Sequence, residues 1–149
     1  MLQIMAALLL VSLISLGCER IETVETDYLD SAAANKADAV GDGKWIPGIL
    51  PHSAKKIRET HNIDTNEIWL FFNFSADDRD SITKACQRIA EHEVIYPRKS
   101  PRTWWPQTLT KRSKDTHPTS ETYEYYRCKD GGSVAIHGDA VFYWHSGRL

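Results

Sequence analysis

Apolar residues recur at helical spacing in two parts of the chain. The first predicted helix starts at a cap formed by Thr26 or Asp27 and ends near Gly41 and Gly43, because glycine tolerates the left-handed conformation of a helix stop. Its apolar positions are Leu29, Ala32, Ala33, Ala37 and Val40. The second predicted helix starts at Asp77 or Asp78, runs to about His92 and buries an apolar stripe. That stripe consists of Ile82, Ala85, Cys86, Ile89 and Ala90.

Between these helices, Pro47 and Pro51 exclude a regular helix or a central strand from the apolar segment 45–51. Ser53 is a good N-cap for a short helix to about Thr60, and the polar residues 64–66 predict a turn.

Residues 67–74 are apolar on both faces, which predicts a central strand covered on both sides. Three further strands are predicted at 122–128, 133–137 and 140–145, and glycine-containing turns join them into a meander. The expected fold class is therefore α+β: a four-stranded antiparallel sheet packed with two longer helices and one short helix.

An almost unbroken apolar run covers residues 4–16 and ends in Ser15-Leu16-Gly17-Cys18. The run has the length of a signal peptide, and its end resembles the lipobox of bacterial prolipoproteins. The resemblance implies that residues 1–17 are a lipoprotein-type signal peptide and that Cys18 is lipidated. Residues 18–26 are then a tether or an edge strand, and 27–149 form a single α+β domain. An uncleaved anchor helix and ordinary secretion are the two alternatives.

The length of 149 residues suits one domain, and 42% hydrophobic with 26% charged residues is a globular composition. The net charge of −2 gives no general attraction to nucleic acid, so no nucleic-acid partner is predicted.

Four residues near the centre are candidates for acid–base or metal chemistry: His52, Glu59, His61 and Asp64. Their spacing matches no zinc signature. The structural alternative is that Asp64 and Asn66 bind backbone donors in the turn while His61 ends the short helix. We therefore predict no catalytic residue, no metal ligand and no cofactor.

If Cys18 is lipidated, Cys86 and Cys128 remain as a pair in an oxidising compartment. A bridge between them would close a loop of about 42 residues and stabilise the fold by roughly 4 kcal/mol in the chain-entropy model. The spacing alone leaves open whether the two residues are bridged.

The segment 98–114 carries six basic residues and no acidic residue. Together with two tryptophans it is a candidate binding surface for anionic lipid head groups or an acidic envelope polymer. Its members are Arg98, Lys99, Arg102, Trp104, Trp105, Lys111, Arg112 and Lys114. The alternative is a solvated loop that Trp104 and Trp105 attach to the core.

Several motifs resemble those of small uncharacterised bacterial lipoproteins. They are Trp45-Ile46-Pro47, Leu50-Pro51-x-Ser53-Ala54, His61-Asn62-x-Asp64-Thr65-Asn66, Trp69-x-x-Phe72, Trp104-Trp105-Pro106, Tyr126-Arg127-Cys128 and Tyr143-Trp144. The resemblance implies an envelope location and a single domain, and it implies no activity.

The leading hypothesis is thus a membrane-anchored, non-enzymatic envelope lipoprotein that binds a protein or polymer partner. By resemblance to Gram-negative lipoproteins, Glu19 after the cysteine favours the outer membrane, facing the periplasm. The alternatives are an envelope hydrolase or metal-dependent enzyme that uses His52, Glu59, His61 and Asp64, and an inhibitor or immunity-like protein.

Overall fold

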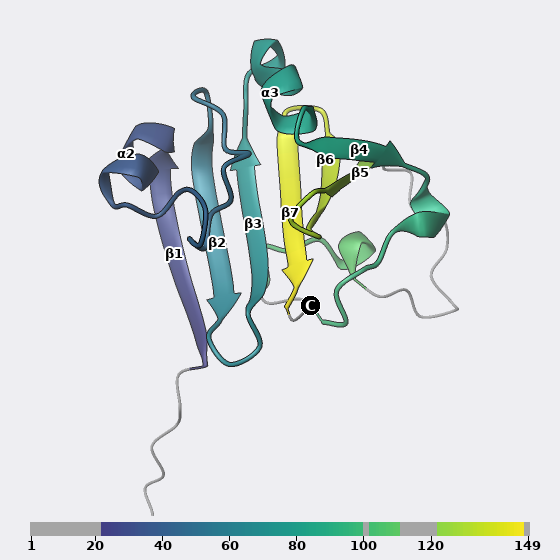
Figure 1. Ribbon diagram of the computed structural model, residues 1–149, viewed down its shortest axis with the longest axis horizontal. Coiled ribbons are helices and arrows are strands. Elements are labelled where there is room, and N and C mark those ends of the chain that lie inside the picture. The colour runs from purple at the N-terminus through teal and green to yellow at the C-terminus, as the bar shows by residue number, and fades with distance from the viewer. Residues whose placement is uncertain (1–21, 100–101, 111–121, 148–149) are drawn as a thin grey trace, which may run out of the picture.

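An antiparallel sheet of seven strands runs through the part of the chain that the computed structural model describes, residues 22–99, 102–110 and 122–147 (Figure 1). In spatial order the strands are β1, β2, β3, β7, β6, β5 and β4. Their bounds are β1 Thr23–Asp30, β2 Lys55–Asn62, β3 Glu67–Asn73, β4 Cys86–Ile89, β5 Glu124–Cys128, β6 Ser133–His137 and β7 Ala140–Ser146. The two α-helices of the described residues are short, α2 Ser31–Lys36 and α3 Arg79–Thr83.

The predicted fold class is wrong, because the described chain is mostly sheet and no long helix packs on it. Residues 27–40 do not form one continuous helix. Their first part belongs to β1, an edge strand in which alternate side chains face opposite sides of the sheet. Leu29, assigned to the helical stripe, is 78% exposed. Only α2 is helical, and the Asp30 carboxylate caps it by accepting a hydrogen bond from the Ala33 N–H at 2.9 Å.

The predicted short helix at 53–60 is replaced by β2. Polar residues dominate this strand, so its sequence lacks the apolar alternation that normally identifies a strand. Lys56 has φ +51°, and the register with β3 shifts between Lys55 and Arg58. This is the geometry of a β-bulge. Pairing with β1 and β3 on both sides supplies the hydrogen bonds that hold the strand.

The predicted helix from 77 or 78 to 92 is divided into four short elements. The 3₁₀ turn η2 Ala76–Asp78 leads into α3, β4 follows, and a second 3₁₀ turn, η3 Glu91–Glu93, comes next. Cys86, expected on a helix face, begins β4 directly opposite Cys128 of β5. The structure is compatible with the bridge that the sequence left open, since the two residues form a disulfide with a Cα–Cα distance of 3.9 Å.

The remaining predicted strands are confirmed. β3 lies between β2 and β7, and β5, β6 and β7 form the meander. The predicted turn between β2 and β3 is also present. The Asn62 side-chain oxygen accepts hydrogen bonds from the backbone N–H groups of Asp64 and Thr65 at 3.0 and 2.8 Å. Asn66 completes the turn with φ +56°.

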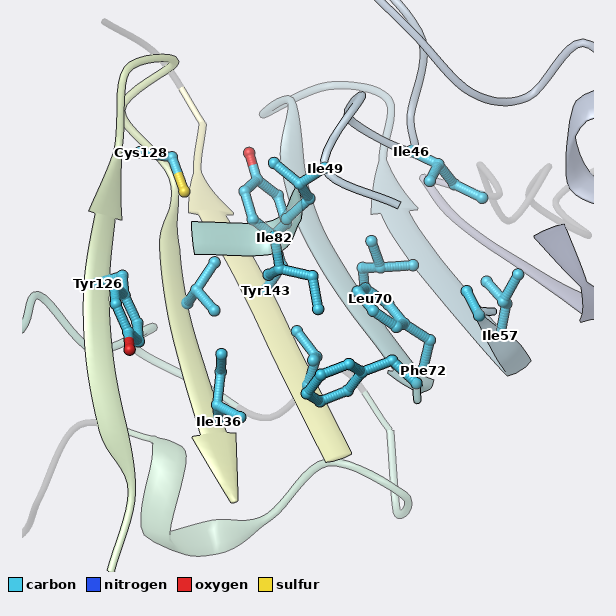
Figure 2. Close-up of a cluster of buried hydrophobic side chains, with 14 of the residues drawn as sticks. Ile46, Ile49, Ile57, Leu70, Phe72, Ile82, Tyr126, Cys128, Ile136 and Tyr143 are labelled. Carbon is cyan, nitrogen blue, oxygen red and sulfur yellow. The ribbon is translucent and has the colours of Figure 1, made fainter. Parts of the chain in front are cut away.

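Hydrophobic side chains cover both faces of the sheet. On one face, Leu70 and Phe72 pack with Ile46 and Ile49 of the segment between α2 and β2, and with Ile82 of α3 (Figure 2). On the other face, the main contacts come from the segment after β4, which includes the 3₁₀ turn η4 Gln107–Leu109. The buried aromatic side chains of this second face are Trp69, Trp105, Tyr125, Phe142 and Trp144.

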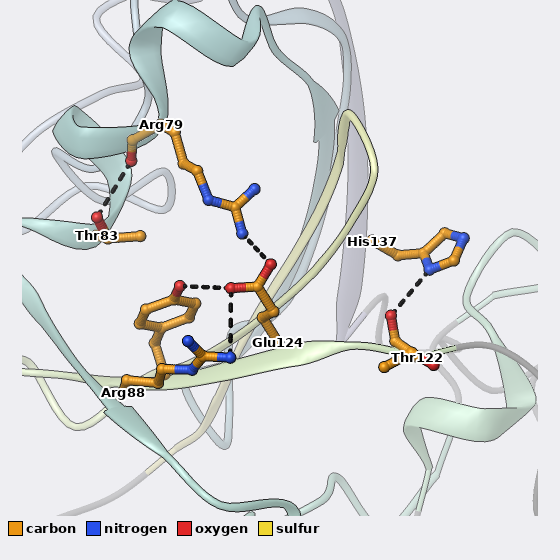
Figure 3. A network of polar contacts seen from close by, with 7 residues as sticks. Arg79, Thr83, Arg88, Thr122, Glu124 and His137 are labelled. Atoms are coloured by element: carbon orange, nitrogen blue, oxygen red, sulfur yellow. Dashed lines mark hydrogen bonds and ion pairs between the residues drawn. The ribbon is translucent and has the colours of Figure 1, made fainter.

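A polar network holds α3 against the sheet (Figure 3). Arg79 of α3 forms an ion pair with Glu124 of β5, and the Tyr126 hydroxyl donates a second hydrogen bond to the same carboxylate at 3.1 Å. The hydrogen bond from Arg79 lowers the pKa of Glu124.

None of the helices within the described ranges has the length and apolar character needed to cross a membrane.

Candidate functional site

Two ionisable side chains are buried together on β2. Glu59 and His61 are two residues apart in a strand, so both point to the same face of the sheet. Glu59 is 2% and His61 6% exposed, and the carboxyl oxygen Oε1 lies 2.9 Å from Nδ1 of the imidazole. On the neighbouring strand β3, Glu59 is paired with Leu70 and His61 with Ile68. This pair is the most buried group of ionisable side chains described.

Burial determines the charge state of the pair. It raises the pKa of Glu59 to about 8 and lowers the pKa of His61. Near neutral pH the carboxyl group therefore keeps its proton and donates a hydrogen bond to Nδ1 of a neutral imidazole. Burial and the neighbouring Glu59 also raise the pKa of Tyr28 on β1. The pair is thus a neutral hydrogen-bonded unit inside an apolar face.

Trp45 covers the imidazole of His61. The two rings are stacked, with centroids 3.8 Å apart and an interplanar angle of 6°. The loop that carries Trp45 is fixed on both sides, because Gly41 N–H donates to the Ile46 carbonyl at 2.9 Å and Ile46 N–H donates to the Ala39 carbonyl at 3.2 Å. Trp45 is consequently held in place by its own loop and by the buried pair.

A pocket of about 600 Å³ lies beside this stack. It is bordered by the Trp45 loop, the β2–β3 turn, the β5–β6 turn and the end of β7. Its aromatic and polar lining residues include Trp45, Asn66, Asp130, Tyr143 and His145. Its volume is typical of small-molecule sites, which span roughly 300–1,000 Å³.

Hydrogen bonds fix the polar wall of the pocket. The Tyr143 hydroxyl donates to Oδ2 of Asp130 at 3.0 Å, and Gly132 N–H donates to Oδ1 at 2.8 Å. His145 Nε2–H donates to the Asp130 carbonyl at 3.2 Å. Burial, followed by the nearby Asp130 carboxylate, raises the pKa of Tyr143, so its hydroxyl remains a donor.

The structure separates the four residues that the sequence suggested as an acid–base or metal cluster. It brings Glu59 and His61 together, whereas His52 and Asp64 are exposed in separate turns. Among the residues that the structure describes, no three or more His, Cys, Asp or Glu side chains are grouped as metal ligands would be. The four-residue site is therefore not assembled.

The basic segment is partly bound to the sheet. A single carboxylate on β1, that of Glu25, accepts hydrogen bonds from Arg102 Nε at 2.8 Å and from Trp104 Nε1 at 2.9 Å. Trp105 is 1% exposed, so it belongs to the core and not to a surface. This agrees with the alternative in which the tryptophans attach the loop to the core.

Two further basic residues of the segment, Arg98 and Lys99, are exposed to solvent. Lys111, Arg112 and Lys114, like Cys18, lie outside the described residues.

Sequence reasoning missed the pocket. Asn66 was assigned to a turn, Asp130 to a hairpin and Tyr143 to a strand, and each assignment is correct locally. The only sequence signal was a tryptophan at position 45 in a loop rich in glycine and proline, a position with no obvious role in a strand or helix. The lining residues come from four segments distant in sequence, so only the fold shows that they are neighbours.

The family model described as YbbD head domain matches residues 22–73. The match covers β1, α2, β2 and β3, and thus the Trp45 loop and the Glu59–His61 pair, whereas β4 to β7 lie beyond it. The chain is similar to this family over that segment. No curated protein and no solved structure matches the chain.

Proposed function

We propose that this protein is a lipid-anchored, non-enzymatic protein of the bacterial cell envelope that binds a protein or polymer partner at the pocket beside Trp45. Support for the anchor comes from the lipobox-like Ser15-Leu16-Gly17-Cys18 after the apolar run. Acyl chains on one cysteine hold a protein at a bilayer, because each buried methylene contributes about 0.8 kcal/mol. The observation that carries the binding role is the pocket with its fixed aromatic wall.

The pocket lies at the end of the sheet where the chain leaves for Cys18. β1 begins at Thr23, and the backbone carbonyl of Glu22 accepts a hydrogen bond from the Ile63 N–H at 2.8 Å. Five residues span at most about 18 Å, so a lipid on Cys18 would keep the start of β1 near the bilayer. Asn66 of the turn after β2 lines the pocket. A partner in the pocket would therefore be held near the membrane surface.

Metabolic labelling with an alkyne analogue of palmitate tests the anchor. We expect the wild-type chain to be labelled and recovered with the membrane fraction, and Cys18→Ser to lose both properties. Ser12→Ala, a change in the same leader, serves as the control and should retain them. Labelling of Cys18→Ser at the wild-type level would contradict the lipid anchor.

Crosslinking in intact cells tests the binding role. Gly48 lines the pocket, its φ is not positive, and an added Cβ would meet no atom within 4 Å, so Gly48→Leu adds bulk at the pocket from a position where its Cβ lies in open space. Ala90→Leu adds the same side chain at an exposed residue that does not line this pocket. We expect envelope partners captured by the wild type and Ala90→Leu to be lost from Gly48→Leu. Identical captures from both variants would refute binding at the pocket.

A further inference from the structure

The pocket beside Trp45 combines one fixed aromatic ring with a hydrogen-bonding wall. One face of the Trp45 indole lies on His61, and because Trp45 is half-buried and lines the pocket, the remaining indole surface borders the pocket. Tyr143 borders the pocket but is only 2% exposed, and its hydroxyl holds the Asp130 carboxylate in place. A ring that is already immobile, as that of Trp45 is, loses little conformational entropy when a ligand packs on it. An apolar ligand face is therefore favoured against this wall.

The same wall offers groups that recognise hydroxyls. Asn66 carries an amide with two donors and an acceptor, and Asp130 carries a carboxylate. Each carboxylate oxygen of Asp130 accepts one hydrogen bond within the protein, from Tyr143 or Gly132, and has a second lone pair. The ligand should thus present several hydroxyl groups along its edge.

The charges around the pocket nearly cancel. Two aspartates, Asp42 and Asp130, and two lysines, Lys44 and Lys129, line it. Lys44 also pairs with Asp38, which does not line the pocket, so the set that includes Asp38 carries one net negative charge. A single unit of charge gives no strong preference for an anion or a cation. This favours a ligand without net charge.

From this combination we infer that the pocket is a binding site for a short neutral saccharide. Sugar rings have an apolar face of C–H groups, which packs on an aromatic ring, and an edge of hydroxyls, which pairs with amides and carboxylates. The inference rests on the proposed binding role, for which it names the ligand class. The saccharide can be a stretch of an envelope glycan or the head group of a glycolipid, since both present the same chemistry.

Binding of chitotriose and maltotriose to the full-length protein tests the inference. The protein is kept in a polyoxyethylene detergent, which contains no sugar, and binding is followed by saturation-transfer NMR and calorimetry. We expect at least one trisaccharide to bind the wild type and Ala90→Leu equally, and to bind Gly48→Leu at least tenfold more weakly. Absence of binding by both trisaccharides, or equal binding to Gly48→Leu, would overturn the inference.

Charged probes of similar size test the charge argument. Trigalacturonate is anionic and the trimer of glucosamine is cationic, and we expect neither to bind more tightly than the best neutral trisaccharide. A tenfold preference for either would refute a neutral ligand. Vesicles with and without a neutral glycolipid then separate the two sources: binding that needs the glycolipid indicates a head group, and binding to soluble trisaccharide alone indicates a glycan.

The outcomes for the ligand and the anchor are separable. Loss of palmitate labelling in Cys18→Ser does not alter saccharide binding in detergent if both proposals hold. Failure of saccharide binding, with Gly48-dependent crosslinking intact, would exclude the saccharide and leave the binding role of the pocket. Trp45→Phe retains an aromatic ring and should bind more tightly than Trp45→Ala, provided that circular dichroism shows both variants to be folded.

Discussion

Glu59 and His61 lie 2.9 Å apart, carboxyl oxygen to Nδ1, on the inner side of a strand whose sequence gives little sign of being buried. The imidazole of His61 stacks on the indole of Trp45, and Trp45 forms one wall of the pocket. The buried pair therefore lies directly beneath one wall of the pocket.

The stability of the protein should fall as the pH rises from 6.5 to 8. The pKa of Glu59 is raised to about 8 in the folded state, whereas an unfolded glutamate ionises near 4.5. The unfolded chain therefore loses this proton first, and each pH unit within the window costs up to about 1.4 kcal/mol. The lowered pKa of His61 destabilises the fold only as the pH falls below about 6.5.

Urea unfolding at pH 6.5, 7.25 and 8 measures this effect. Glu59→Gln has the same shape and no proton to lose, so its unfolding free energy should stay constant over the window. Equal pH slopes for the wild type and Glu59→Gln would show that Glu59 does not titrate in this range.

Removal of the disulfide should destabilise the protein substantially. Cys86 and Cys128 are 42 residues apart and join β4 to β5. A loop of that length implies roughly 4 kcal/mol in the chain-entropy model. We expect the double variant Cys86→Ser/Cys128→Ser to unfold at lower urea concentration, and the wild type with a reductant to behave like it. If reductant leaves the wild-type midpoint unchanged while alkylation shows two free thiols, the bridge does not stabilise the fold.

Gly132→Ala should be destabilising by about 1–3 kcal/mol, the usual cost of overpacking a core. A Cβ at Gly132 would lie 2.3 Å from Cε2 of the buried Tyr143 ring, so the ring must move. Gly48→Ala is the matched control, because its Cβ meets no atom within 4 Å. Thermal unfolding of both variants measures the difference, and equal midpoints would mean that the ring moves at no cost.

Trp105→Ala should cost about 3–5 kcal/mol, as is typical for loss of a buried aromatic side chain. Trp105 is 1% exposed and packs edge-to-face on Phe142 and Trp144. Trp104 is only partly buried, so Trp104→Ala should cost clearly less. Chemical denaturation of the two variants compares them. Similar losses would indicate that Trp104 contributes to the core as much as its neighbour.

Short-range signals predicted the elements that depend on short-range chemistry. The two apolar faces of residues 67–74 predicted β3, and glycine-containing turns predicted β5 to β7. The turn after β2 is predicted by its polar residues 64–66, and the side chain of Asn62 accepts hydrogen bonds from the turn backbone. The alternative in which Trp104 and Trp105 attach the basic segment to the core also follows from the sequence, and both side chains pack in the core cluster on the second face of the sheet.

The predicted helices are wrong because small or isolated apolar residues fall at helical spacing by chance in segments that form strands. In β1 the alternation Val24, Thr26, Tyr28 on the inner side was hidden by the weak hydrophobicity of threonine. In β2, Glu59 and His61 occupy inward positions that a sequence pattern assigns to apolar side chains. Their mutual hydrogen bond makes burial possible, and that bond exists only once the strand has formed.

By itself, the sequence determined the central strand, the meander, the turn before β3 and the expectation of a lipidated Cys18, because each depends on neighbouring residues. Only the tertiary structure decided that 23–30, 55–62 and 86–89 are strands and that four distant segments enclose a pocket. Strand pairing is a long-range interaction, and its hydrogen bonds can hold a polar segment in a sheet whatever its local preference.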